Sequence, residues 1–257
     1  MFGVPSILSV HGLQPTMPLS FLALPFEIRD QIYWNLLVAP SYIHLCPGAK
    51  WGNQRPCRTD TGEPLDLCPA ILRTNRFICD EATPILYARN AFVMATLDPR
   101  SFGLADTRVA EGFLSSIGPK NAALIRHVSI PFPIFGNYHA GQVALDNLSE
   151  EVIGLLRDSC PSLVQLETEA GVNLNTIEIL FDWQGYQIAS EAAAAMNASF
   201  RTISSLEKIV VNIFPLLDHP TCNPVIIEKM RDQGWEVCVV PADGKALRHG
   251  RMPDARV

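Results

Sequence analysis

Short apolar runs alternate with amphipathic stretches through the second half of this chain, and this alternation constrains the fold more than any other feature. The runs have the length and β-branched content of strands, and the stretches between them repeat apolar residues at helical spacing. Strands separated by helices connect in parallel, so the alternation predicts an α/β fold with a mostly parallel sheet. The expected strands are 125–132, 163–168, 206–214 and 235–240, and the expected helices are 148–157, 174–182, 188–200 and 225–233.

Two of the segments that lead into strands are similar to one another. Residues 160–166 read Cys-Pro-Ser-Leu-Val-Gln-Leu, and residues 203–209 read Ile-Ser-Ser-Leu-Glu-Lys-Ile. Such self-similarity is typical of degenerate leucine-rich-type repeats, in which strand–helix units stack on their neighbours. An ordinary open α/β sheet explains the pattern equally well, so both architectures are expected for residues 121–241.

The first half of the chain has an α+β character. Besides the first helix, we expect a second helix that opens at Pro69 and is kinked or broken at Pro84, because proline removes a helical hydrogen bond. A third helix is expected over 107–117, ended by Gly118 and Pro119. Short strands are expected at 42–45 and 91–95, and the breaker-rich stretch 46–68 is expected to be a long loop.

The first helix, within residues 22–37, is the most informative single element. Pro25 stands where a first helical residue would, since its missing N–H costs nothing there, and Glu27 suits the positive end of the helix dipole. Ile28, Ile32 and Leu36 then recur every four residues as one apolar stripe. This pattern predicts an amphipathic helix, and it indicates no catalytic reaction.

Three blocks of the first half, in their order and spacing, resemble a known family. The opening block, which runs Leu-Pro-x-Glu-Ile-Arg-x-x-Ile-Tyr-x-x-Leu-Leu over residues 24–37, resembles the divergent F-box of filamentous fungi. The second and third blocks are similar to the companion motifs of those proteins. They are Ile71–Arg76, Asp80–Ala82, Pro84–Tyr87, Asn90 and Phe92, and then Phe113–Leu114, Ile117–Asn121 and Leu124–His127.

The related fungal two-EXR domain shares this layout, and Glu27-Ile28-Arg29 matches its first Glu-x-Arg. The second block has Thr74-Asn75-Arg76 where the second Glu-x-Arg would stand, which favours the F-box-like assignment. The resemblance covers residues 20–130 and implies a helical F-box-like module that docks a Skp-type adaptor of a cullin–RING ubiquitin ligase. The α/β region would then present a surface to a protein substrate.

The resemblance implies that apolar residues of the first helix contact the adaptor. The expected partner-binding residues are Leu24, Pro25, Ile28, Ile32, Leu36 and Leu37. The same stripe serves equally as the core face of the helix, packed on the second helix. Burial discriminates the two readings, because four or more fully buried residues among the six would favour a core.

These patterns divide the chain into four parts. Residues 1–20 carry no charge and three prolines, and they are expected to be a flexible lead-in. Residues 21–120 form the F-box-like module, 121–241 the α/β region, and 242–257 a flexible tail. The tail holds the only basic cluster of the chain, which we interpret as solvated. Its members are Lys245, Arg248, His249, Arg251 and Arg256.

Composition excludes several classes of protein. A net charge of −6 argues against a nucleic-acid partner, which a basic patch would attract. No stretch approaches the roughly 20 uninterrupted apolar residues that a membrane span needs, and the N-terminus lacks the features of a secretory signal. The seven cysteines are odd in number and contain no Cys-x-x-Cys pair, as expected for free thiols in the cytoplasm or nucleus.

The sequence carries no recognisable catalytic motif. A Gly-x-Ser-x-Gly elbow and the glycine-rich phosphate loops are missing, so we expect no enzyme and no cofactor. An α/β enzyme without a motif remains the alternative, and it would gather His139, Asp218 or His219 in one cleft after the strands. His127 is interpreted as a strand-edge histidine.

Metal binding and acid pairs are weighed in the same way. His44, Cys46, Cys57 and Cys68 could clip the long loop with zinc, but only the first two are closely spaced, so no metal is expected. The acidic residues of the first two helices are interpreted as helix-surface charges. They are Glu27, Asp30, Asp80 and Glu81.

Overall fold

A computed structural model describes residues 20–46, 55–58, 66–94, 107–137, 143–170, 186–213 and 224–239. Several expectations fall outside these ranges. They concern the lead-in and the basic tail, the helix at 174–182, and the residues His139, Asp218 and His219.

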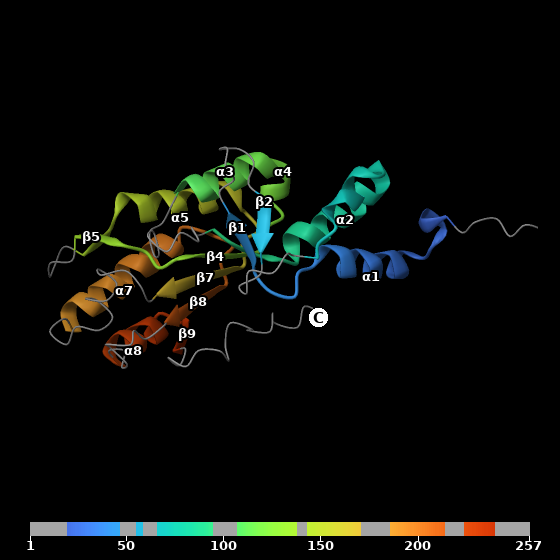
Figure 1. Ribbon diagram of the computed structural model, residues 1–257. Coiled ribbons are helices and arrows are strands. Elements are labelled where there is room, and N and C mark those ends of the chain that lie inside the picture. Colours follow the sequence, from blue (N-terminus) through green and yellow to red (C-terminus); the bar gives the residue numbers. More distant parts are fainter. Residues whose placement is uncertain are drawn as a thin grey trace, which may run out of the picture.

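One seven-stranded sheet forms the centre of the molecule (Figure 1). Its strands are β1 (Ile43–Cys46), β2 (Arg55–Arg58), β3 (Ala91–Val93), β4 (His127–Pro131), β7 (Gln165–Ala170), β8 (Lys208–Ile213) and β9 (Glu236–Val239). Their order across the sheet is β2-β1-β3-β4-β7-β8-β9. Six strands are parallel and only the edge strand β2 is antiparallel to its neighbour, so the predicted α/β class with a mostly parallel sheet is confirmed. A separate two-stranded ribbon pairs β5 (Phe135–Asn137) with β6 (Ala144–Leu145).

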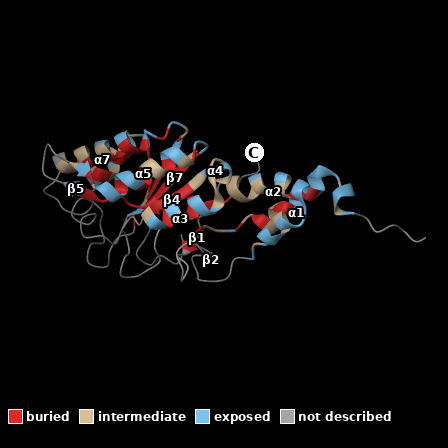
Figure 2. Cartoon of the chain, turned by 90° about the horizontal axis from the view of Figure 1, so that it is seen from above, coloured by how far each residue is buried: buried red, intermediate tan, exposed pale blue. Residues whose placement is uncertain are grey.

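The helices that follow β3 form one layer in chain order. Helix α3 contacts α5, α5 contacts α7, and α7 contacts α8. Buried residues gather where this layer meets the sheet (Figure 2). The bounds are α3 (Thr107–Ile117), α4 (Pro119–Ala122), α5 (Asn147–Ser159), α7 (Tyr186–Phe200) and α8 (Pro224–Asp232).

The six parallel strands lie along the sheet in the order in which they occur in the chain. Right-handed connections that always step in the same direction leave their helices on the same face of the sheet. Stacked strand–helix units build a sheet in this way as well. Among the six parallel strands that the structure describes, the order never reverses, so these strands form no switch-point crevice of the kind that binds ligands in doubly wound sheets.

The main core lies between this sheet and its helices. Alternate residues of neighbouring strands line up in register, as where Val128 faces Leu166 and Leu166 faces Ile209. All three side chains are buried on the same face of the sheet. Polar contacts tie the helices together: Ser199 donates to both carboxylate oxygens of Glu150 at 2.8 Å, which joins α7 to α5.

Several predicted boundaries are corrected. The expected loop 46–68 contains β2, which pairs with β1. The second helix does not break at Pro84: a 3-10 helix, η2 (Pro69–Arg73), ends at Thr74, and α2 (Arg76–Ala88) then runs through the proline. Pro84 and Asp80, whose carbonyl would have bonded the missing N–H, are both exposed, so water can satisfy that carbonyl.

Local capping explains two further differences. Gly118 adopts a φ of 77°, the left-handed conformation expected at a helix end, but Pro119 then opens the short helix α4. Helix α5 begins at Asn147, one residue before the expected start at 148. Its N-cap is Asp146, whose carboxylate accepts a 2.8 Å hydrogen bond from the Ser149 amide.

Candidate protein-interaction surface

Two helices that run in the same direction, with both carboxyl ends toward the sheet, stand apart at one end of the molecule and have a hydrophobic core of their own (Figure 1). They are α1 (Phe26–Leu37), preceded by the 3-10 helix η1 (Phe21–Ala23), and α2. Tyr33 and Leu37 of α1 and Ile78 and Ala82 of α2 are buried against one another. This helix pair coincides with the first two blocks of the F-box resemblance.

A buried ion pair joins the two helices. The Arg29 guanidinium donates to both carboxylate oxygens of Glu81, with Nη2 to Oε1 at 2.6 Å and Nε to Oε2 at 3.0 Å. The Tyr33 hydroxyl donates to the same Oε2 at 3.0 Å, and Arg29 also donates to the Leu24 carbonyl. A bidentate arginine–carboxylate pair fixes both position and angle, so these contacts lock the helices in one arrangement.

The network changes the ionisation of its members in the directions that this geometry requires. Hydrogen bonds from Arg29 hold the pKa of Glu81 below its ordinary value, and the bond to Glu81 raises the pKa of Arg29. Burial, followed by the contact with Glu81, raises the pKa of the Tyr33 phenol. The interpretation of Glu81 as a surface charge is therefore wrong, whereas Glu27 and Asp80 are exposed as expected.

The face that α1 turns toward α2 lies one residue beyond the predicted stripe. Arg29, Tyr33 and Leu37 are the buried residues of the helix, and they repeat with the same spacing of four. Ile28 is exposed and Ile32 is only half-buried. The stripe predicted from the sequence is therefore not the buried face of α1, and Arg29 can lie on that face because its charge is compensated across the interface by Glu81.

The six expected partner-binding residues are therefore divided by the packing. Leu37 is fully buried and belongs to the core of the helix pair. Pro25 and Ile28 are exposed, and Leu24, Ile32 and Leu36 are half-buried. One fully buried residue among six falls short of the four that would have favoured a core.

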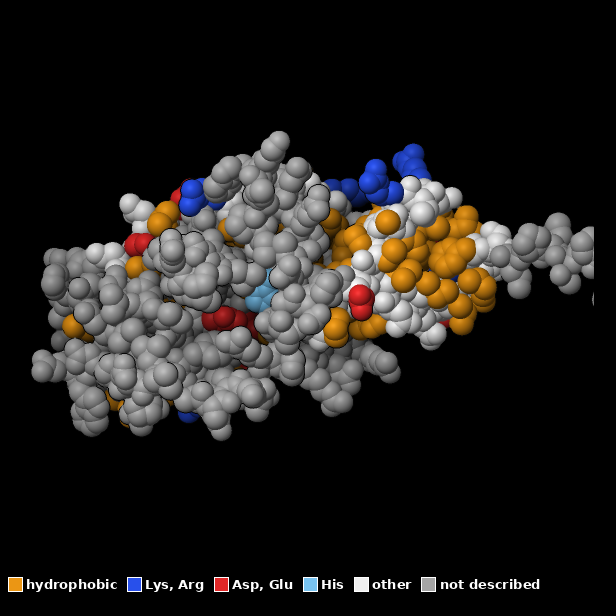
Figure 3. All heavy atoms as spheres, viewed as in Figure 1, with side chains coloured by type: hydrophobic (Ala, Val, Ile, Leu, Met, Phe, Trp, Pro, Cys, Tyr) orange, Lys and Arg blue, Asp and Glu red, His pale blue; other side chains and the backbone are white. Residues whose placement is uncertain are grey.

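Large apolar side chains concentrate on the surface of this helix pair. Six of them are exposed among the described residues, and four lie here. Figure 3 shows hydrophobic side chains spread over this end of the molecule. We call these four the apolar patch: Leu22, Phe26, Ile28 and Phe77, which are 41%, 52%, 42% and 51% exposed.

Arg29 supports the aromatic part of the patch from below. Its guanidinium carbon lies 6.0 Å from the ring centroid of Phe26 and 5.4 Å from that of Phe77. Both rings rest on this fixed cation and still expose half of their surface. Aromatic side chains, phenylalanine among them, are enriched at the cores of protein interfaces.

Leu22, Phe26 and Phe77 do not belong to the stripe that the sequence predicts. A signal for the arrangement did exist. Arg29, Tyr33 and Leu37 share the spacing of Ile28, Ile32 and Leu36, and an opposite charge, Glu81, lies in the second block. Which of two stripes turns inward depends on that distant partner.

One asparagine connects the helix pair to the sheet. Asn90 is completely buried, and its side chain accepts from the Ala39 amide and donates to the carbonyls of Leu37 and Leu86, each at 2.7 Å. The side chain therefore bonds the ends of both helices directly before β3. Arg29, Glu81 and Asn90 all lie within the motif blocks of the resemblance.

A polar cluster occupies the face of the sheet opposite the helix layer. The carboxylate of Glu167, which is 8% exposed, accepts 2.6 Å hydrogen bonds from the Tyr42 hydroxyl and from the Gln165 side chain. The contact with Tyr42 attaches the residue directly before β1 to β7. Both carboxylate oxygens are satisfied by protein groups, which is the state expected of a structural contact.

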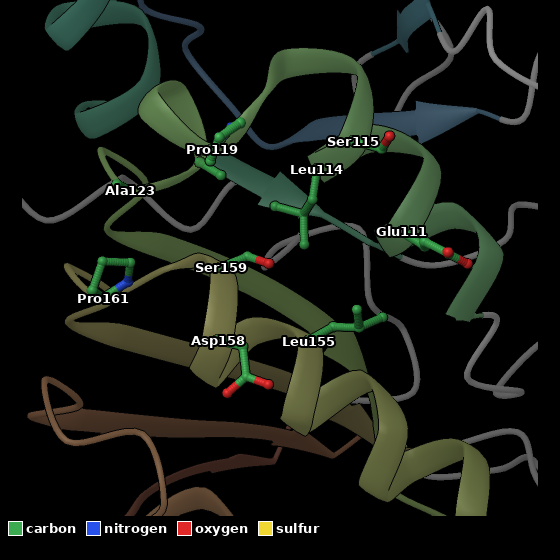
Figure 4. Close-up of a pocket in the computed structure, with 10 residues that line it drawn as sticks. Glu111, Leu114, Ser115, Pro119, Ala123, Leu155, Asp158, Ser159 and Pro161 are labelled. Carbon is green, nitrogen blue, oxygen red and sulfur yellow. The ribbon is translucent and has the colours of Figure 1, made fainter.

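A surface pocket of about 420 Å³ lies between α3, α4 and the end of α5 (Figure 4). Leu114 and Leu155 point into it from opposite helices, and Glu111 and Asp158 lie at its rim. The Asp158 carboxylate is already paired with Arg157. The pocket lies where α3 and α5 end and lead into β4 and β7, which is at the amino-terminal ends of these strands. Enzymes with α/β sheets bind their ligands at the carboxyl-terminal ends instead.

Metal-binding and reactive side chains form no further candidate functional site in the described part of the chain. No group of histidine, cysteine and acidic side chains is arranged to hold a metal among these residues. The side chains of Cys46 and Cys57, which the zinc hypothesis needs, lie outside them. Cys68 is exposed, whereas Cys160 is buried, and burial raises the pKa of its thiol to about 12. His127 is half-buried at the start of β4, and burial lowers its pKa.

Comparison with known proteins finds no matching family model, no matching curated protein and no matching solved structure. Among the helices that the structure describes, none combines the length and the hydropathy that a membrane span requires.

Proposed function

We propose that this chain is a protein-interaction protein whose N-terminal helix pair docks another protein through the apolar patch. The observation that carries the proposal is the exposure of Leu22, Phe26, Ile28 and Phe77 on a pair of helices that already has its own buried core. Exposed apolar side chains that gather on one part of a surface mark candidate protein-interaction sites. The Arg29–Glu81 pair keeps the patch rigid, which lowers the entropic cost of binding.

We further propose that the docked protein is a Skp-type adaptor of a cullin–RING ubiquitin ligase. The support for this is the resemblance of residues 20–130 to the divergent fungal F-box, together with the accessibility of the residues that the resemblance assigns to docking. Pro25 and Ile28 are exposed, and Leu24, Ile32 and Leu36 are partly accessible beside them. The α/β region would then present a protein substrate to the ligase.

A non-ligase scaffold is the second candidate. The same apolar patch would serve a scaffold equally well, and the structural observation that favours it is the separate core of the helix pair, which needs no particular partner to form. The two functions differ in the identity of the protein bound, so a defined adaptor distinguishes them.

The test is complex formation between the full chain and a purified Skp-type adaptor, followed by size-exclusion chromatography. We expect the wild-type proteins to co-elute and Ile28→Asp to abolish the complex, because a charge would be buried in an apolar contact. Leu148→Asp is the matched control. Leu148 is an aliphatic residue of the same size as Ile28 and is 44% exposed, but it lies on α5. Circular dichroism should show both variants folded.

Failure of the wild-type chain to bind the adaptor would remove the ligase function and leave the scaffold. Equal loss of binding in Ile28→Asp and Leu148→Asp would show that the apolar patch is not the docking surface.

A further inference from the structure

The apolar patch has a charged border that differs from one side to the other. On the side of α2, Arg76 is exposed directly before Phe77, and Arg73 is exposed at the end of η2, four residues before Phe77. Figure 3 shows basic side chains along this edge of the hydrophobic surface. On the side of α1, the exposed charge is Glu27, next to Phe26.

The two arginines are available to a partner. Neither takes part in an ion pair or a side-chain hydrogen bond within the described part of the chain. Asp80 is exposed one helical turn beyond Arg76, so two cations face one carboxylate and the α2 edge stays net positive. Glu81 adds no free charge there because it is paired with Arg29.

We infer that the patch docks a partner that carries acidic side chains opposite Arg73 and Arg76, beside an apolar pocket that receives Phe77. This inference rests on the proposed function and adds the charge and the orientation of the adaptor surface. Charges at the border of an interface steer encounter and set the register of docking more than they add affinity. The border of the apolar patch, basic beside α2 and acidic beside α1, would therefore determine the orientation in which the adaptor binds.

Arg76 offers a substitution that tests the charge without harming the fold. It is the first residue of α2, and Asn75 caps that helix through a 2.8 Å hydrogen bond to the Phe77 amide. An acidic side chain in the first turn suits the helix dipole, so Arg76→Glu should fold at least as stably as the wild type. Lys120→Glu is the matched control, because Lys120 is an exposed cation in the first turn of α4, away from the patch.

The experiment measures adaptor affinity of the full chain by biolayer interferometry between 50 and 500 mM NaCl (salt range set by the screening length). At the lowest salt we expect Arg76→Glu to bind about fivefold more weakly than the wild type, with most of the change in the association rate. The difference should shrink toward zero at the highest salt, and Lys120→Glu should match the wild type throughout.

The outcomes separate the two proposals. Equal binding by Arg76→Glu and the wild type, or tighter binding by the variant, overturns the acidic-partner inference while adaptor docking stands. No binding by the wild type overturns the proposed ligase function and this inference together. A loss that is equally large at every salt concentration also contradicts the inference, because a screened border charge cannot cause it.

Discussion

Arg29 decides how the N-terminal helix pair is built. A charged residue is buried only when its charge is compensated, and the fork of Arg29 meets both oxygens of Glu81. The same guanidinium supports Phe26 and Phe77 on the surface above it. One residue therefore orients the core of the pair and the aromatic part of the apolar patch.

Replacing Arg29 by lysine should destabilise the helix pair although the charge is kept. Lysine cannot make the two parallel hydrogen bonds to Glu81 or stack flat beneath the two rings. We expect a lower melting temperature and faster proteolysis of the first helix. Arg231→Lys, at an exposed position of α8, is the control. An unchanged melting temperature for Arg29→Lys would show that the fork geometry contributes nothing.

The Glu81 ion pair also predicts an acid dependence. The pKa of Glu81 is lowered in the folded chain from its ordinary value of 4.5, so the folded state binds fewer protons than the unfolded state near that pH. Its stabilising contribution is complete above pH 4.5 and is lost as the pH falls through the lowered pKa. Glu81→Gln should be less stable than the wild type at neutral pH, and this difference should narrow in acid.

His127 predicts a second pH effect at higher pH. Burial first, and then the nearby charges of Arg126, Arg89 and Lys208, lower its pKa below 6.5. The folded state therefore resists protonation, and stability should decline as the pH falls below about 6.5. Urea titrations between pH 5 and 8 should show a shallower decline for His127→Gln, and identical slopes would contradict the prediction.

Among the elements, the two faces of α1 differ in how much they contribute to the stability of the fold. Leu37→Ala should lower the free energy of unfolding by about 3 kcal/mol, because it opens a cavity in the small core that Leu37 shares with Tyr33. Ile28→Ala should change it by less than about 0.5 kcal/mol, since Ile28 is exposed. The reverse ranking in denaturant titrations would restore the predicted stripe as the core face.

The sheet could be predicted from the sequence because its signals are local. A nearly continuous apolar run such as 208–213 predicts a buried parallel strand. The helical spacing of apolar residues predicts the helices between the strands. The bounds of α3, Thr107–Ile117, could be predicted for the same reason, since Gly118 ends the helix. Local patterns of this kind need no knowledge of distant partners.

The inward face of α1 could not be predicted in this way. Ile28 and Arg29 compete for that face, and the outcome depends on Glu81, which lies 52 residues further on. Strand β2 could not be predicted for a related reason: its sequence, Arg-Pro-Cys-Arg, has no strand character, and it becomes a strand by pairing with β1. Contacts across long chain distances override local propensity at both places.

At the scale of the whole molecule, two hydrophobic cores are joined by a short polar connection. The helix pair and the sheet each bury their own cluster, and Asn90 bonds both helices where they enter the sheet. Asn90→Ala should cost about 2–4 kcal/mol, because it leaves buried backbone groups of α1 and α2 without partners. Thermal unfolding should lose cooperativity, and a single unchanged transition would refute the role of Asn90 as the connection.

Hydrogen–deuterium exchange of the full chain with and without a purified Skp-type adaptor tests the central claim most directly. The account predicts slowed exchange in residues 21–37 and 76–81 when the adaptor is present, and no change in 147–159 on α5. Slowed exchange confined to the helices of the sheet, or no change anywhere, would contradict it.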